Sequence, residues 1–170
     1  LEMLKEVLQD ESIKKIGQNI KYDALVLRRY GTELNGIHFD TMVASYVLNP
    51  SLRQHNLDNL AQHFLGHKMI SYGEVVGKGK DAGNFSEVDV EAAMTYSCED
   101  ADITWRLYEL LLRRLRDNDL EELYQKLEHP LVDVLAELEW NGIAIDAEAL
   151  SALSDGLAAT LEIEAKDIYE

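Results

Sequence analysis

The sequence has almost no cysteine, no long apolar run and few basic side chains. Its one cysteine, Cys98, can form neither an internal disulfide nor a CxxC metal site, which fits a reducing compartment. No stretch approaches the ~18–20 uninterrupted apolar residues that span a bilayer, and the first residues lack the basic and then apolar layout of a signal peptide. We therefore expect a cytoplasmic protein.

Positive charge is scarce. The 170 residues include 16 Lys and Arg against 32 Asp and Glu, a formal net charge of −16. Phosphate backbones are normally held by Lys and Arg, so the overall charge argues against binding nucleic acid through a bulk electrostatic field. Carboxylates can still engage a phosphodiester when divalent cations lie between the two, so the placement of the acids decides the question.

Apolar spacing predicts an α/β chain that consists mostly of helices. Asp40 is a good N-cap, and the stretch GKGKDAGN at 77–84 is the most loop-like part. Short strands are expected around 15–18 and 37–39. Helices are expected over 1–8, 20–30, 41–48, 57–64, 89–115, 120–140 and 147–170.

Two features indicate that the chain is a piece of a longer protein. Two or three short strands are too few for a stable sheet, so we expect further strands upstream. At the other end, Leu150, Leu153 and Leu157 mark an apolar helix stripe with no later element to cover it, so a partner element is expected downstream.

Two pairs of polar residues have a spacing that suits metal-assisted hydrolysis. Asn19 and Asp23 are four residues apart, as are Tyr96 and Asp100, so each pair lies on one helix face. An Asp can hold Mg²⁺ or Mn²⁺ while the group one turn away orients the attacking water. Such pairs are also common on solvated helix faces, so neither pair is specific by itself.

The order of the motifs is more specific. The blocks KIGQNIKYDALVLRRYG, FDTMVASYVLNP, HNLDNLAQHFLGHK, GKGK, YSCEDADITWRLYELL and EHPLVDVLAELEWNGIAIDAEAL follow one another along the chain. Together they resemble the 3′→5′ proofreading exonuclease and the start of the polymerase domain in bacterial family A DNA polymerases, the DNA polymerase I family. The resemblance implies the later part of a ribonuclease H-like exonuclease domain over residues 1–117, and the first helices of a polymerase domain over 118–170.

The resemblance also implies roles for individual residues. Asp23 and Asp100 correspond to two of the four carboxylates that hold two Mg²⁺ or Mn²⁺ ions, and Tyr96 to the tyrosine that orients the nucleophilic water. The partner would be the single-stranded 3′ end of DNA. The residues expected to contact that end are Gln18, Asn19, His55 and Tyr72.

Three departures from the family pattern matter. The motif that supplies the other two carboxylates, an Asp-x-Glu on an upstream strand, is absent, since no Asp-x-Glu of this sequence lies on a strand-like apolar run and Asp10 and Glu11 are adjacent. Gln54 stands where relatives carry an arginine, and the polymerase palm and fingers are missing. We therefore expect the 170-residue chain alone to be inactive. Because Asp23 and Asp100 would repel each other without metal, we also expect the pKa of at least one of them to be raised.

Several alternatives remain open. His63 and His67 have the spacing of a zinc pair but lack the glutamate of HExxH, so ordinary histidines at a helix end are favoured. Lys78 and Lys80 could meet phosphates or belong to a solvated loop. The whole domain could be an inert exonuclease-fold scaffold, although the presence of Asp23, Tyr96 and Asp100 argues against that for the parent enzyme. A stand-alone ribonuclease of the same fold is disfavoured by the polymerase-like tail from residue 128.

Overall fold

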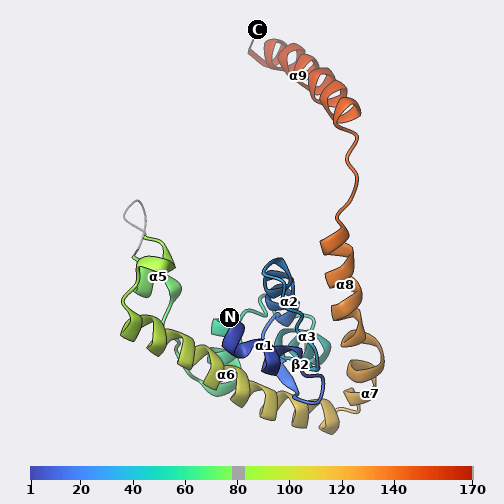
Figure 1. Cartoon of the computed structure of the whole chain (residues 1–170). Helices are drawn as coiled ribbons and strands as arrows, with labels where there is room; N and C mark the ends of the chain where they lie inside the picture. Colours follow the sequence, from blue (N-terminus) through green and yellow to red (C-terminus); the bar gives the residue numbers. More distant parts are fainter. Residues whose placement is uncertain (78–82, 170) are drawn as a thin grey trace. The chain divides into compact units, whose positions relative to one another are not determined.

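The computed structural model describes residues 1–77 and 83–169 (Figure 1). Lys78 and Lys80 lie outside the described residues. The chain forms two compact units, Leu1–Glu137 and Leu138–Glu170. The elements in order are α1 (Glu2–Gln9), β1 (Lys15–Gly17), α2 (Ile20–Arg29), β2 (Ile37–Asp40), α3 (Thr41–Leu48), α4 (Leu57–Leu60), the π-helical turn η1 (Ala61–Leu65), α5 (Tyr72–Val76), the 3₁₀ turn η3 (Phe85–Glu87), α6 (Val90–Asp117), α7 (Glu121–Leu123), the π-helical turn η4 (Tyr124–Glu128), α8 (Pro130–Asn141) and α9 (Ala147–Tyr169).

The two predicted strands form a small parallel sheet. Ile16 pairs with Phe39 and Gly17 with Asp40, with an irregularity in the register between Lys15 and Ile16. Helix α2 connects the strands, as a parallel pair requires. The predicted α/β class is confirmed, and the sheet among the described residues has only these two strands.

The core of the first unit lies along one face of α6, the long helix in Figure 1. Ile103, Leu107, Leu111 and Leu115 recur every fourth residue and are fully buried, so they form one continuous stripe. Strand β1 and helix α3 pack against this helix. The remaining buried members of the core are Phe39, Ala44, Leu60, Ala61, Met69 and Tyr124. Burial of this stripe therefore fixes the orientation of α6 against the sheet, including the position of the opposite face of the helix.

Asp40 joins the two strand–helix connections. Its carboxylate accepts hydrogen bonds from the backbone N–H groups of Met42 (2.8 Å) and Val43 (3.3 Å), which confirms that it caps α3. The same carboxylate also accepts from Asn19 N (3.1 Å) and Ile20 N (2.8 Å) at the start of α2. Negative charge is favourable at a helix N-terminus, so one buried carboxylate stabilises the beginnings of two helices.

Two predicted helices are interrupted. The helix expected over 57–64 consists of α4 and the π-helical turn η1, which Gly66 ends with a φ of 64°. The helix expected over 120–140 is divided into α7, η4 and α8. Pro130 has no N–H to continue an α-helical ladder, and His129 N donates instead to Tyr124 O, five residues back, at 2.8 Å. The backbone geometry around a proline explains the second interruption.

The second unit contains the end of α8 and the helix α9. None of the residues of α9 is buried, and the predicted stripe residues Leu150, Leu153 and Leu157 are exposed. Within residues 1–77 and 83–169, no helix is both long and apolar enough to cross a membrane.

Candidate functional site

Asp23 and Asp100 line the same cavity. This cavity has a volume of about 560 Å³ and lies between β1, α2, α4 and α6. Asp23 comes from the first turn of α2, and Asp100 from the face of α6 beside the cavity. The other lining residues are Ile16, Gly17, Gln18, Leu57, Ser97, Ala101, Thr104 and Trp105. The structure thus brings together two carboxylates that are 77 positions apart in the sequence.

The pKa of Asp23 is raised above its ordinary value. Partial desolvation by the surrounding protein is the main cause, although the residue as a whole keeps an exposed surface, and the negative charge of Asp40 adds to the shift. A raised pKa was expected, but the cause is different. Asp23 lies near Asp40, which caps α2 and α3, and the electrostatic part of its raised pKa comes from Asp40 and not from Asp100.

The pKa of Asp100 is also raised. Desolvation contributes most, followed by the negative charges of Asp58 and Glu99, while a hydrogen bond from Tyr96 acts in the opposite direction. Desolvation and the neighbouring Asp100 likewise raise the pKa of the Tyr96 phenol. Tyr96 therefore keeps its hydroxyl proton at neutral pH, and it lies within hydrogen-bonding reach of the carboxylate one turn further along α6.

Gln18 and His55 are joined to each other by a hydrogen bond. The side-chain amide of Gln18 donates to the backbone oxygen of His55 (2.7 Å) and accepts from the hydroxyl of Thr41. The Nδ1 of His55 lies 2.9 Å from the hydroxyl of Ser45, whereas its Nε2 is buried and has no hydrogen-bond partner among the described residues. Contacts within the protein therefore already fix the orientation of both side chains.

Asn19 takes a left-handed conformation with a φ of 58° at the N-cap of α2. Non-glycine residues rarely adopt this conformation, and Asn is one of the few that tolerate it. The hydrogen bond from its N–H to Asp40 holds the strained residue in place. The conformation fixes the turn between β1 and α2, directly before Asp23.

Tyr72 belongs to an aromatic group beside the cavity. Its ring, which is 53% exposed, stacks on Phe85 with centroids 6.1 Å apart and an interplanar angle of 17°. Tyr96 completes the group, with its ring centroid 6.5 Å from that of Tyr72 and 6.0 Å from that of Phe85. The predicted substrate-contacting and water-orienting tyrosines are therefore direct neighbours. Phe85 did not emerge from the sequence because it lies on a short 3₁₀ turn outside any motif.

Glu99 is a second residue that the sequence motifs did not single out. Its Oε1 lies 2.8 Å from Nε2 of His67, and its Oε2 accepts a hydrogen bond from the backbone N–H of Ile70 (2.8 Å). The hydrogen bond to His67 is the main reason why the pKa of Glu99 is lowered. His67 thus pairs with a carboxylate. The ring of His63 packs edge-on against that of Phe64, with the ring centroids 4.6 Å apart.

The described residues contribute two carboxylates to the cavity, Asp23 and Asp100. Hard cations such as Mg²⁺ and Mn²⁺ prefer such oxygen ligands. Within residues 1–77 and 83–169, however, no cluster of three or more Asp, Glu, His or Cys side chains could hold a metal by itself. Asp23 and Asp100 therefore fit a divalent metal only as part of a larger ligand set.

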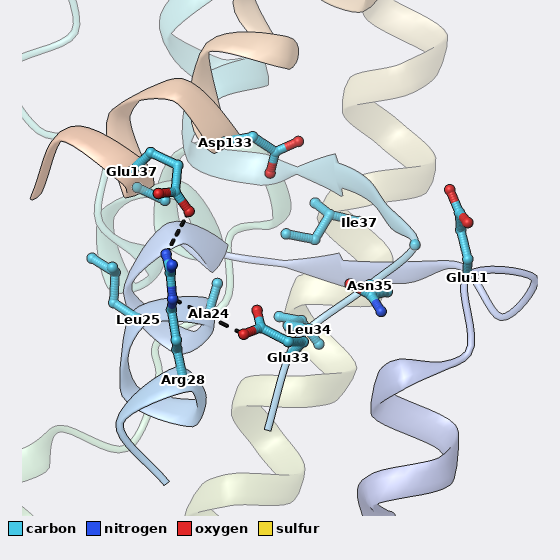
Figure 2. A pocket seen from close by; sticks show the side chains of 12 residues that line it. Glu11, Ala24, Leu25, Arg28, Glu33, Leu34, Asn35, Ile37, Asp133 and Glu137 are labelled. Atoms are coloured by element: carbon cyan, nitrogen blue, oxygen red, sulfur yellow. Dashed lines mark hydrogen bonds and ion pairs between the residues drawn. The ribbon is translucent and has the colours of Figure 1, made fainter. Parts of the chain in front are cut away.

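A second cavity, of about 480 Å³, contains none of the predicted site residues (Figure 2). Arg28 of α2 lies between two carboxylates there, with N–O distances of 2.5 Å to Glu137 and 4.0 Å to Glu33. Glu11 and Asp133 also line this cavity. Arg28 is on the same helix as Asp23, so the ion pair with Glu137 links that helix to α8.

The chain is similar to known proteins over most of its length. A profile described as 3′-5′ exonuclease matches residues 1–116. DNA polymerase I of Rhizobium leguminosarum is 46% identical over 158 residues, which is 93% of this chain and 16% of that protein. DNA polymerase I of Pseudomonas aeruginosa is 38% identical over 173 residues, which is 100% of this chain and 19% of that protein. The chain thus spans less than a fifth of the length of these relatives.

A solved structure shows the same fold. The POL domain of Pol1 from M. smegmatis, in complex with DNA primer-template and dNTP, superposes with a TM-score of 0.76 at 26% sequence identity. The match covers 98% of this chain and 26% of that chain. The arrangement of helices and strands described above is therefore that of a segment within a much longer polymerase chain.

Proposed function

This chain belongs to the 3′-5′ exonuclease family of the DNA polymerase A type, and from that membership we propose that it forms part of the proofreading site of a bacterial DNA polymerase I. In this proposal, residues 1–117 are the later part of the exonuclease domain and residues 118–170 begin the polymerase domain. The complete protein removes nucleotides from the single-stranded 3′ end of DNA and releases nucleoside 5′-monophosphates.

One observation supports this proposal more than any other. Asp23 and Asp100 line one cavity, and the phenol of Tyr96 lies one helical turn before Asp100, within hydrogen-bonding reach of it. Two carboxylates beside a protonated hydroxyl are suited to holding a divalent cation and orienting a water molecule for attack on phosphorus. Asp23 is on α2, whereas Tyr96 and Asp100 are on α6, so their convergence is a property of the fold.

The residues of this chain have separate roles in the reaction. Asp23 and Asp100 would hold Mg²⁺ or Mn²⁺, which when bound would supply a more acidic water and positive charge for the phosphate. The hydroxyl of Tyr96 orients the attacking water. The water oxygen forms a bond to phosphorus and loses a proton to solvent, while the bond from phosphorus to the 3′-oxygen breaks and that oxygen gains a proton from solvent to become the new 3′-hydroxyl.

The substrate end is bound by stacking and polar contacts. The exposed ring of Tyr72 offers a face to a base, as aromatic side chains do in single-strand channels. Gln18, Asn19 and His55 lie at the end of β1 and in the loop bonded to it, beside the terminal nucleotide. Because a mispaired end frays more readily, it reaches this single-strand site at a lower free-energy cost than a paired end.

Asp100→Ala in the complete polymerase tests the proposal. Exonuclease release of mononucleotides from a single-stranded oligonucleotide should fall by at least about a hundredfold, because a metal ligand is lost. DNA synthesis should remain near normal, since it occurs on another domain. Asp102→Ala is the matched control, because Asp102 is an exposed carboxylate on the same helix that pairs with Arg106 at 2.8 Å. Equal exonuclease rates for Asp100→Ala and the parent would contradict the proposal and would favour an inert scaffold.

A further inference from the structure

Glu99 connects two parts of the chain that both reach the aromatic group. Its side chain is 17% exposed, and both carboxylate oxygens are used, one by the ring of His67 and one by the N–H of Ile70. These partners precede Glu99 by 32 and 29 residues. Glu99 therefore joins the segment before α5 to α6 through two charge-assisted hydrogen bonds to that segment.

The position of Glu99 on α6 gives this contact a functional meaning. Glu99 comes three residues after Tyr96 and directly before Asp100, so it belongs to the helical turn that carries both proposed site residues. On the other side, Ile70 is two residues before Tyr72, the first residue of α5. The distance between the tyrosine rings thus depends on how the segment 67–72 is held against this turn of α6.

Apart from the bonds of Glu99, the segment 67–72 is fixed mainly at its start and in its middle, and the N–H of His67 donates to the backbone oxygen of Ala61 at 3.2 Å. Gly66 precedes it with a φ of 64°, where a left-handed residue turns the chain. Met69 is buried in the core and anchors the middle of the segment. The capping box of Ser71 and Glu74 stabilises α5 itself but does not attach it to α6. The hydrogen bonds of Glu99 supply that attachment next to Tyr72.

We propose that Glu99 is a positioning residue that holds Tyr72 beside Tyr96 and so presents a stacked 3′ end to the cavity. Glu99 acts through Tyr72 and does not itself touch the substrate. This inference rests on the exonuclease function proposed above. His67, which has the spacing of a zinc pair with His63, is here the partner of Glu99 and shares its positioning role.

The test uses the complete polymerase and a single-stranded oligonucleotide, with kcat and KM measured separately. Glu99→Ala should raise KM about tenfold, the effect of losing one to two charge-assisted hydrogen bonds, and should change kcat less than about threefold. His67→Ala should raise KM in the same direction by less. Glu99→Gln should stay within about threefold of the parent, because its amide oxygen still accepts from Ile70 N. Asp102→Ala should match the parent.

A double-mutant cycle with Tyr72 separates positioning from a general structural effect. If Glu99 acts through the ring of Tyr72, Glu99→Ala should raise KM no further in the Tyr72→Ala background. Independent, multiplying effects of the two substitutions would overturn the proposal, as would a parent-like KM for Glu99→Ala and His67→Ala. DNA synthesis and the thermal unfolding temperature of every variant show whether the protein is folded.

The outcomes also distinguish this inference from the proposed function. Loss of exonuclease activity in Asp100→Ala together with a parent-like Glu99→Ala would leave the function standing and reject the role of Glu99. Parent-like exonuclease activity in Asp100→Ala would reject both. If Glu99→Ala fails to fold, His67→Ala takes its place, because it removes one of the two hydrogen bonds. His67→Ala should then raise KM no further in the Tyr72→Ala background.

Discussion

The carboxylate of Asp40, at the end of β2, accepts a hydrogen bond of 2.8 Å from the N–H of Ile20, the first residue of α2. That helix carries Asp23 in its first turn, three residues later. Asp40 is 1% exposed and lies 20 residues from Ile20 in the sequence. The position of a proposed metal ligand therefore depends on a buried acid that does not line the cavity itself.

Asp40→Ala should destabilise the chain by about 3 kcal/mol, because it removes the caps of two helices and leaves buried N–H groups without an acceptor. The free energy of unfolding in urea measures this effect. Asp89→Ala is the matched control. Asp89 is an exposed N-cap that accepts one hydrogen bond, from Glu91 N at 3.0 Å, and its loss should cost about 1 kcal/mol. Equal losses for the two variants would contradict the double role of Asp40.

Asp23→Asn should stabilise the chain at neutral pH in the absence of metal. Desolvation and the charge of Asp40 raise the folded-state pKa of Asp23, so its ionised form weakens the fold at a pH above that pKa. This destabilisation disappears as the pH falls and the carboxyl becomes protonated. The difference in unfolding free energy between the Asn variant and the parent should therefore become smaller at low pH. Urea unfolding at pH 7.5 and pH 4.5, with a chelator present, measures this difference.

Asp102→Asn is the control for this pH dependence, since it removes an exposed carboxylate that forms an ion pair with Arg106. It should give no stabilisation at neutral pH. A variant of Asp23 that is less stable than the parent at pH 7.5 would show that the carboxylate is favourably solvated or paired.

Tyr96→Phe in the complete polymerase should reduce the exonuclease rate less than Asp100→Ala does. The substitution removes the hydroxyl that is proposed to orient the water, an effect of ~10²–10⁴-fold at most, but keeps both carboxylates and the aromatic contacts. Its kcat on single-stranded DNA should fall while KM stays near the parent value. A loss equal to that of Asp100→Ala would mean that the role of Tyr96 is misassigned.

The 170-residue chain by itself should release no mononucleotides from single-stranded DNA, even with millimolar Mg²⁺ or Mn²⁺. Among residues 1–77 and 83–169, Asp23 and Asp100 are the two carboxylates that line the cavity, and two acids cannot fix two hard cations at the close spacing that in-line displacement requires. A full-length proofreading polymerase serves as the positive control. Metal-dependent release that Asp23→Ala abolishes would show that the Asp-x-Glu motif is dispensable.

Local patterns in the sequence were sufficient for the main elements and for the pairs within one helix. The two strands, the cap at Asp40 and the long helix α6 were all predicted, because helical periodicity and capping depend on neighbours within four residues. The adjacency of Tyr96 and Asp100 on one face follows from the same spacing. The interrupted helix before Pro130 was missed because a π-helical turn has no strong sequence signal.

Only the tertiary structure determined which residues that are far apart in the sequence come into contact. Nothing in the sequence shows that Asp40 caps a helix that begins 20 positions earlier, or that Glu99 bonds to His67 and Ile70. It likewise could not show that desolvation and Asp40 raise the pKa of Asp23, in place of the expected repulsion from Asp100. Hydrogen bonds and desolvation depend on the distances between atoms. For residues within one or two turns of a helix, the sequence alone determines these distances. For residues that are far apart in the sequence, the packing of the fold determines them.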